Sequence, residues 1–201
     1  MSFFKRCPLR LLIASVPLLT SVPGIAQTVM NGNGGPVRLF GTDQAVFEMR
    51  EPRQDLPCHV TPTKSALVGF DLKFHSGFEV TVPLRELAGR ENLLTILFRV
   101  APLEDLENPV YFMQKVRVPE IEEDAKGDAS LYGAFDLGEG KYRVDWLMRD
   151  RAERICSNYW EVEATLNGKE SQMAMVIPPK SVRAADQESF KDEPPIERAA
   201  A

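Results

Sequence analysis

Histidine and cysteine are scarce in this sequence of 201 residues, which holds two histidines and three cysteines. Neither histidine stands in an H-x-x-H or H-E-x-x-H pattern, and no C-x-x-C pair occurs, so nothing in the sequence supports a zinc site. The G-x-S-x-G motif of serine hydrolases and the phosphate-binding P-loop are missing too. We therefore predict a protein that is not an enzyme, with no catalytic residue, metal ligand or cofactor.

Two weaker patterns do not change this prediction. His75 and Ser76 are adjacent, but neighbouring residues of a strand point to opposite faces, so they rarely form a nucleophile–base pair. Five acidic residues between 120 and 128 offer oxygen atoms of the kind that calcium binds, yet they lack the D-x-[DN]-x-[DN]-G spacing of a calcium loop. We expect a solvated loop there.

Long hydrophobic runs are absent after the first 26 residues. The chain starts with three basic residues, continues through a mostly apolar run at 11–22 and reaches the small residues Gly24 and Ala26. This three-part pattern is typical of a secretory signal peptide. The apolar run is shorter than the roughly 20 residues of a membrane-spanning helix. We predict cleavage after Ala26 and a periplasmic or secreted protein with no transmembrane segment in the mature chain.

Basic residues are fewer than acidic ones, with 24 Lys and Arg against 29 Asp and Glu. The whole chain carries a net charge of −5, and removal of Lys5, Arg6 and Arg10 with the signal peptide takes it to −8. Nucleic acids and anionic membranes are bound by clustered Lys and Arg, so neither is an expected partner. Of these classes of partner, only a protein of the cell envelope is compatible with the charge.

After cleavage the cysteines are Cys58 and Cys156. Two cysteines in an oxidising compartment favour one disulfide. The alternative is a pair of separate buried thiols, because spacing along the chain does not show whether two Cα atoms approach closely enough.

Helical periodicity is also absent, and short alternating runs take its place. We expect eight or nine strands and at most one helical turn, which would end at Gly89. The expected strands include a short one at 45–51, a hairpin of 70–74 and 78–82 around a turn at Ser76-Gly77, a central strand at 92–100, an alternating strand at 109–119, and a last strand after a turn at Asn167-Gly168. Residues 27–36 are expected to be a flexible leader, 37–179 the folded domain and 180–201 a disordered tail.

A second hairpin is predicted over residues 140–164, with a solvated tip at "RDRAER". Its apolar residues are even-numbered on both strands. We choose the register in which the numbers of two paired residues sum to 304. Val144 then lies opposite Trp160 and Trp146 opposite Asn158, and both tryptophans lie on the inner face. The outer face was not used to set this register, yet it then brings Arg143 opposite Glu161, as cross-strand stabilisation prefers.

The start of this hairpin carries a resemblance. Leu137, Gly140, Tyr142 and Val144 form the pattern L-x-x-G-x-Y-x-V. It resembles a strand opening of immunoglobulin-like bacterial β-sandwich domains, where a corner tyrosine bonds back to the backbone just before a core position. The resemblance implies that Tyr142 is the corner and Val144 the core residue. The core cysteine of antibody domains is absent, and the motif bears on fold, not on activity.

Together these patterns predict an all-β fold, a two-sheet antiparallel immunoglobulin-like sandwich, with an up-and-down barrel as the alternative. The function we expect is that of a non-catalytic binding or adaptor module. The alternatives are a carbohydrate-active hydrolase or a carbohydrate-binding module. The hydrolase would need two of the strand carboxylates Asp71, Glu79, Asp145 and Glu161 in one groove. The binding module would need an exposed aromatic, for which Tyr159, opposite Asp145 on the outer face, is the best surface-contact candidate, ahead of Tyr111 and Phe112.

Overall fold

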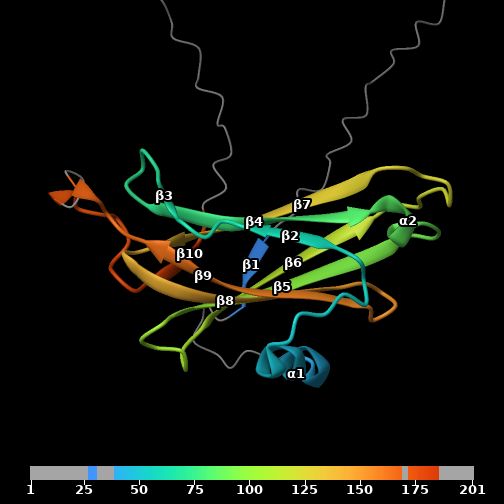
Figure 1. Ribbon diagram of the computed structural model, residues 1–201, viewed down its shortest axis with the longest axis horizontal. Helices are drawn as coiled ribbons and strands as arrows, with labels where there is room; N and C mark the ends of the chain where they lie inside the picture. The colour runs from blue at the N-terminus through green and yellow to red at the C-terminus, as the bar shows by residue number, and fades with distance from the viewer. Residues whose placement is uncertain (1–26, 31–38, 169–171, 186–201) are drawn as a thin grey trace, which may run out of the picture.

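Two antiparallel sheets pack face to face in the computed structural model, which describes residues 27–30, 39–168 and 172–185 (Figure 1). The first sheet contains, in spatial order, β1 (Gln27–Val29), β6 (Val110–Val118), β5 (Asn92–Pro102), β8 (Gly140–Arg149) and β9 (Ile155–Ala164). The second contains β10 (Val182–Ala184), β7 (Asp128–Leu137), β4 (Phe74–Pro83) and β2 (His59–Pro62), with β3 (Leu67–Val68) also paired to β4. The predicted all-β two-sheet architecture is confirmed, and the sheets do not close into a barrel.

Alternation along the strands builds the core between the sheets. Inward positions are apolar and buried, and Phe78 of the second sheet meets Phe98 and Trp146 of the first in edge-to-face contacts, with ring centroids 5.3 and 5.4 Å apart. Trp160 is buried beside them, so both tryptophans belong to the core, as predicted. The strand predicted at 92–100 is β5, which lies in the middle of its sheet.

The hairpin of β8 and β9 has the predicted register. Val144 pairs with Trp160, Trp146 with Asn158 and Arg143 with Glu161. At the start of β8 the hydroxyl of Tyr142 donates a hydrogen bond of 2.7 Å to the carbonyl of Gly138, the backward contact expected of a corner tyrosine. Burial raises the pKa of Tyr142 to about 12, so the hydroxyl keeps its proton and stays a donor.

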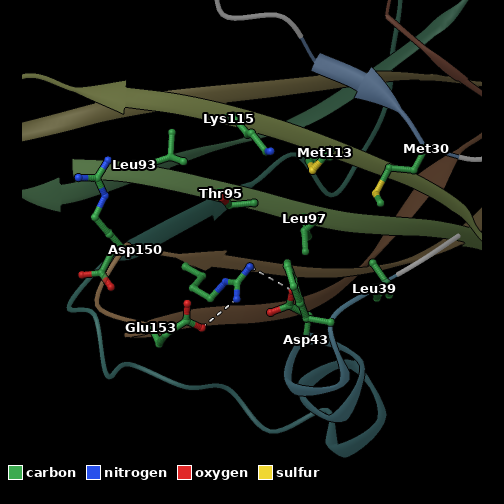
Figure 2. A pocket seen from close by; sticks show the side chains of 13 residues that line it. Met30, Leu39, Asp43, Leu93, Thr95, Leu97, Met113, Lys115, Asp150 and Glu153 are labelled. Carbon is green, nitrogen blue, oxygen red and sulfur yellow. Dashed lines mark hydrogen bonds and ion pairs between the residues drawn. The ribbon is translucent and has the colours of Figure 1, made fainter. Parts of the chain in front are cut away.

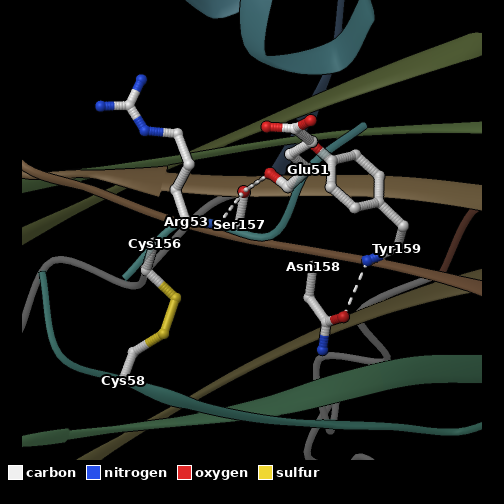
Figure 3. The surroundings of a disulfide bond; sticks show 7 residues. All are labelled: Glu51, Arg53, Cys58, Cys156, Ser157, Asn158 and Tyr159. Carbon is white, nitrogen blue, oxygen red and sulfur yellow. Dashed lines mark hydrogen bonds between the residues drawn. A yellow bond between two sulfur atoms is a disulfide. The ribbon is translucent and has the colours of Figure 1, made fainter. Parts of the chain in front are cut away.

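Cys58 and Cys156 form the predicted disulfide, with Cα atoms 6.3 Å apart (Figure 3). The segment that leads to Cys58 runs along β9. Ser157 donates its backbone N–H to the carbonyl of Arg53, and its side chain lies between Arg53 and Glu51. The disulfide therefore fastens a covering segment to the edge of the first sheet.

The hairpin predicted around Ser76-Gly77 is wrong, because β4 runs straight through both residues. Ser76 is buried and its hydroxyl donates to the carbonyl of Thr63. A Cβ on Gly77 would meet the carbonyl oxygen of Gly133 at 2.2 Å, so glycine allows two strands to approach closely here and makes no turn. The chain turns earlier, between β3 and β4, where Leu72 takes a left-handed φ of 57°.

A helix replaces the strand predicted at 45–51. It is α1 (Gly41–Met49), and it lies against the outer face of the first sheet (Figure 1). Val46 and Phe47 are buried under it, one helical turn from the equally buried Asp43. The second helix, α2 (Leu84–Leu87), is the single turn expected before Gly89. Among the described residues neither helix is long and apolar enough to cross a membrane.

The ends of the domain also differ from prediction. Gln27–Val29, expected in the flexible leader, pair with β6 as β1, and Val182–Ala184, expected in the disordered tail, pair with β7 as β10. No strand follows Asn167-Gly168 among the described residues up to Ser181, although Ile177 is buried. The predicted signal peptide and the remainders of the leader and tail lie outside the described residues.

Candidate functional site

A cavity of about 310 Å³ opens between α1, the outer face of the first sheet and the tip of the β8–β9 hairpin (Figure 2). Its wall is largely apolar, with side chains from β5 and β6 on one side and the start of α1 on the other. The apolar lining residues are Met30, Leu39, Phe40, Leu93, Leu97 and Met113. A volume near 300 Å³ is at the lower end of the range for small-molecule pockets in proteins.

The helix that forms one side is fastened to the sheet by a second, smaller core. Val46 and Phe47 of α1 pack on Leu97, Leu147 and Ile155, which are outward-facing residues of the first sheet. Apolar side chains at outward positions of β5 and β8 are the sequence signal that this face is covered. That signal is hard to separate from the near-continuous apolar run of β5, which a central strand explains equally well.

Polar contacts fasten the helix as well. The guanidinium of Arg99 donates to the carboxylate of Asp145 at 2.8 Å and to the backbone carbonyl of Phe47 at 3.2 Å. Asp145 is buried, and Arg50 and Arg143 lie 3.5 and 3.7 Å from it. Three arginines thus surround one carboxylate beneath α1, which supplies the charge compensation that a buried carboxylate needs.

Tyr159, the predicted surface-contact residue, lies opposite Asp145 as expected but under α1. Its hydroxyl donates to the carbonyl of Val46 at 2.7 Å, and the guanidinium of Arg50 lies 5.5 Å from its ring centroid. The half-buried ring therefore helps to hold the helix in place, and its role as a surface contact stays a prediction. Of the other two candidates, Phe112 is in the core and Tyr111 is half-buried beside the second core.

Asp43 is the unusual polar residue of the cavity wall. It is completely buried, and neither carboxylate oxygen accepts a hydrogen bond from the described residues. Burial raises the pKa of Asp43, and the guanidinium of Arg149, 3.5 Å away, acts in the opposite direction. The wall thus contains a carboxylate with unused acceptor capacity in apolar surroundings.

The hairpin tip borders this cavity, so it is more than the solvated turn we predicted. Arg149 joins Asp43 to Glu153, and its guanidinium stacks on the exposed ring of Phe40, 4.9 Å from the centroid. Asp150 is buried and accepts from the backbone and side chain of Arg154, each at 2.9 Å. These bonds give the tip a fixed shape beside the cavity.

The arrangement offers little for acid–base catalysis. The three carboxylates of the cavity wall are all paired with an arginine, and Arg149 serves two of them. The carboxylates considered for a hydrolase do not converge in one groove. Asp145 lies among arginines and Glu161 is exposed on β9, both in the first sheet. Asp71 and Glu79 belong to the second sheet, where Asp71 lies in the turn before β4 and not on a strand, and Glu79 accepts a hydrogen bond from Tyr132. In the described part of the chain no group of three or more His, Cys, Asp or Glu is placed to hold a metal ion.

A polar cluster that the sequence did not reveal lies on the outer face of the second sheet. His75 contacts Asp136 through Nδ1 at 2.8 Å and Asp71 through Nε2 at 2.9 Å. The ammonium of Lys73 lies 3.2 Å from the carboxylate of Asp71 and 3.8 Å from that of Asp136. Asp136 is directly opposite His75 on β7, a pairing that strand alternation alone cannot assign.

Comparison with known proteins adds no assignment. No family model and no curated protein matches the chain. Two solved structures share some geometry, both of variants of one protein, superoxide reductase (neelaredoxin) from Ignicoccus hospitalis. They are 12% and 13% identical, with TM-scores of 0.33 and 0.30, over 61% and 64% of this chain and 87% and 99% of theirs. Similarity this slight says nothing about the chemistry of this chain.

Proposed function

We propose that this chain is an exported, non-catalytic binding module of the cell envelope, and that the cavity beside α1 receives an apolar group of a protein partner. The observation that carries the proposal is the apolar cavity itself, placed on an outer sheet face where Leu97 is buried in a cluster with Val46 and Phe47 of α1. The N-terminal pattern of residues 1–26 supports export. The net charge of −8 after cleavage supports a protein partner over a nucleic acid.

The charged border of the cavity supports a protein partner as well. Residues of both charge signs line the cavity, among them Lys115, Arg151 and Glu153. Figure 2 shows Lys115 and Glu153 on opposite sides of the opening. An apolar centre with a polar border is the usual arrangement of a hot spot at a protein interface. A hydrolase has less support, because the carboxylates of the cavity wall are paired with arginines.

Capture from an envelope extract tests the proposal. The bait is the exported chain from Gln27 to Ala201, compared with the variants Lys115→Trp and Arg117→Trp. Both residues are exposed on the same strand, two positions apart, and both substitutions exchange a cation for an indole, but only Lys115 lines the cavity. We expect the native bait and Arg117→Trp to retain the same protein in stoichiometric amount, and Lys115→Trp to retain about tenfold less, a difference of about 1.4 kcal/mol.

Two results would count against the proposal. If Lys115→Trp retains its partner as well as Arg117→Trp does, the cavity is not the binding site. If no bait retains a protein, the chain is not a binding module under these conditions, and a screen of glycans for hydrolysis would follow. Circular dichroism and thermal unfolding of both variants confirm that the comparison is between folded proteins.

A further inference from the structure

We infer that the open edge of β7, from Asp128 to Ala134, is a second binding surface, which takes up an extended peptide strand of a partner protein with a basic C-terminal end. This surface is separate from the cavity beside α1 and belongs to the other sheet. On one side β7 pairs with β4 along its whole length. On the other side β10 covers only Phe135 to Leu137, so the first seven residues of β7 have no neighbouring strand among the described residues.

The direction of the backbone groups follows from contacts on both sides of the strand. The N–H of Gly138 donates toward β10, to the carbonyl of Ser181, and the carbonyls of Tyr132 and Ala134 accept from glutamine side chains that reach the open side. Because alternate residues of a strand direct their N–H and C=O to the same edge, even-numbered residues of β7 face outward. The amides of Ser130 and Tyr132 are therefore directed to the open edge, and those of Ala129 and Leu131 to β4.

Other strand edges of the described sandwich are short, covered or carry cations, such as Lys115 and Arg117 on the part of β6 beyond β1. Along β9, the N–H groups of Ser157 and Glu163 donate to Arg53 and Lys64, so covering segments occupy that edge. The edge strand β2 has four residues and ends at Pro62, and β1 has three. The open part of β7 reads DASLYGA and contains neither lysine nor proline, the residues that commonly block edge-to-edge pairing.

A cavity of about 320 Å³ lies where the next strand would run, lined by Gln27, Gln114 and residues 130–134 of β7. Gln114 is 5% exposed, and its amide nitrogen donates to the carbonyl of Tyr132 at 3.3 Å. Its buried Oε1 accepts no hydrogen bond from the described residues. The glutamine side chains thus already reach the carbonyls of this edge from the first sheet, and an entering strand would supply N–H donors beside them.

The charge around the edge selects the partner. An added strand antiparallel to β7 ends next to Asp128, and the exposed segment that leads into β7 is mostly acidic, with Glu122, Glu123 and Asp124 against the one cation Lys126. Lysine or arginine at the C-terminal end of the peptide complements these carboxylates.

Amide hydrogen exchange of the full exported chain, read residue by residue by NMR, tests this inference. The probe is the acetylated peptide TVTVTVKK, with TVTVTVEE and an N-methylated TVTVTVKK as matched controls. We expect the amides of Ser130 and Tyr132 to exchange fast in the free protein and about tenfold more slowly with millimolar TVTVTVKK, while Ala129 and Leu131 are protected throughout. TVTVTVEE should protect less, and the N-methylated peptide, which lacks alternate donors, not at all.

Each other outcome overturns the inference. Equal protection by the acidic or N-methylated peptide would show that neither charge nor strand pairing is responsible. If the amides are protected in the free protein and deletion after Ala185 removes that protection, the tail is the occupant of the edge. If the protection grows with protein concentration, the occupant is a second copy of the chain. The variant Ser130→Pro removes the outward N–H without taking a donor from β4, and it should abolish protection of Tyr132 while the fold persists. Loss of envelope capture by Lys115→Trp leaves this test unaffected.

Discussion

His75 illustrates how one titratable residue joins two strands and a turn. Both ring nitrogens lie within hydrogen-bond distance of a carboxylate, so only the protonated ring can donate to both. Burial lowers the pKa of His75, but the bonds to Asp71 and Asp136 outweigh it and the pKa is raised above 6.5. Burial also raises the pKa of Asp71, yet bonds from His75 and Lys73 leave it below its usual value.

A pH dependence of stability follows at this residue. Since the folded-state pKa of His75 is raised, its contribution is complete below the unfolded value near 6.5 and is lost as the pH rises through the folded value. We expect the variant His75→Gln to lose more unfolding free energy at a pH of about 5.5 than at about 8, as measured by urea denaturation. NMR titration should show that Asp71→Asn lowers the pKa of His75, whereas Glu79→Gln, on the same strand without contact to the ring, leaves it in place. An equal loss at both pH values would refute the charged bridge.

At the scale of the element, α1 is held on the sheet by few contacts. Two buried apolar side chains and the bonds from Arg99 and Tyr159 attach it. The helix ends where Arg50 adopts a left-handed φ of 54° and returns its N–H to the carbonyl of Val46. A helix of nine residues is not stable alone, so its presence depends on these contacts.

Removing the hydrogen bond from Tyr159 measures how far α1 depends on its contacts with the sheet. We expect Tyr159→Phe to lower the unfolding free energy by about 1 kcal/mol, since one buried hydrogen bond is lost while the carbonyl of Val46 keeps its bond from Arg50. Amides of α1 should exchange faster than in the native protein. The matched control is Tyr132→Phe, which removes the hydrogen bond from an exposed tyrosine to the half-buried Glu79 and should cost less than about 0.5 kcal/mol. A Tyr159→Phe variant as stable as the control would show that the helix is held by packing alone.

For the whole molecule, the disulfide joins residues 98 positions apart, and the contacts around it tie the covering segment to β9. Closing a loop of this length restricts the unfolded chain by about 4–5 kcal/mol in the chain-entropy model. We expect the double variant Cys58→Ala/Cys156→Ala to unfold at a lower denaturant concentration, with a loss of about 2–5 kcal/mol. Reductant should lower the midpoint of the native protein and leave the double variant unchanged. A native midpoint that does not respond to reductant would contradict this role.

The sequence by itself determined the features that depend on local alternation. The register of β8 and β9 could be predicted because a slip of one residue would place the apolar sets of the two strands on opposite faces of the sheet. The disulfide could be predicted as a hypothesis because the N-terminal pattern predicts an oxidising compartment, where two cysteines have few alternatives to pairing. The backward bond of Tyr142 followed from an eight-residue pattern that lies within one turn and one strand.

Tertiary structure alone decided the rest. Residues 45–51 alternate as a strand would, but the outward Leu97 and Leu147 provide an apolar surface that a helix covers better. Ser76-Gly77 has the composition of a turn, yet the close approach of Gly133 from the neighbouring strand makes glycine necessary inside β4. The cavity wall joins residues next to β1 with α1, β5, β6 and the hairpin tip, and no sequence period brings such distant segments together. Long-range contacts, not local preference, therefore built both candidate binding surfaces.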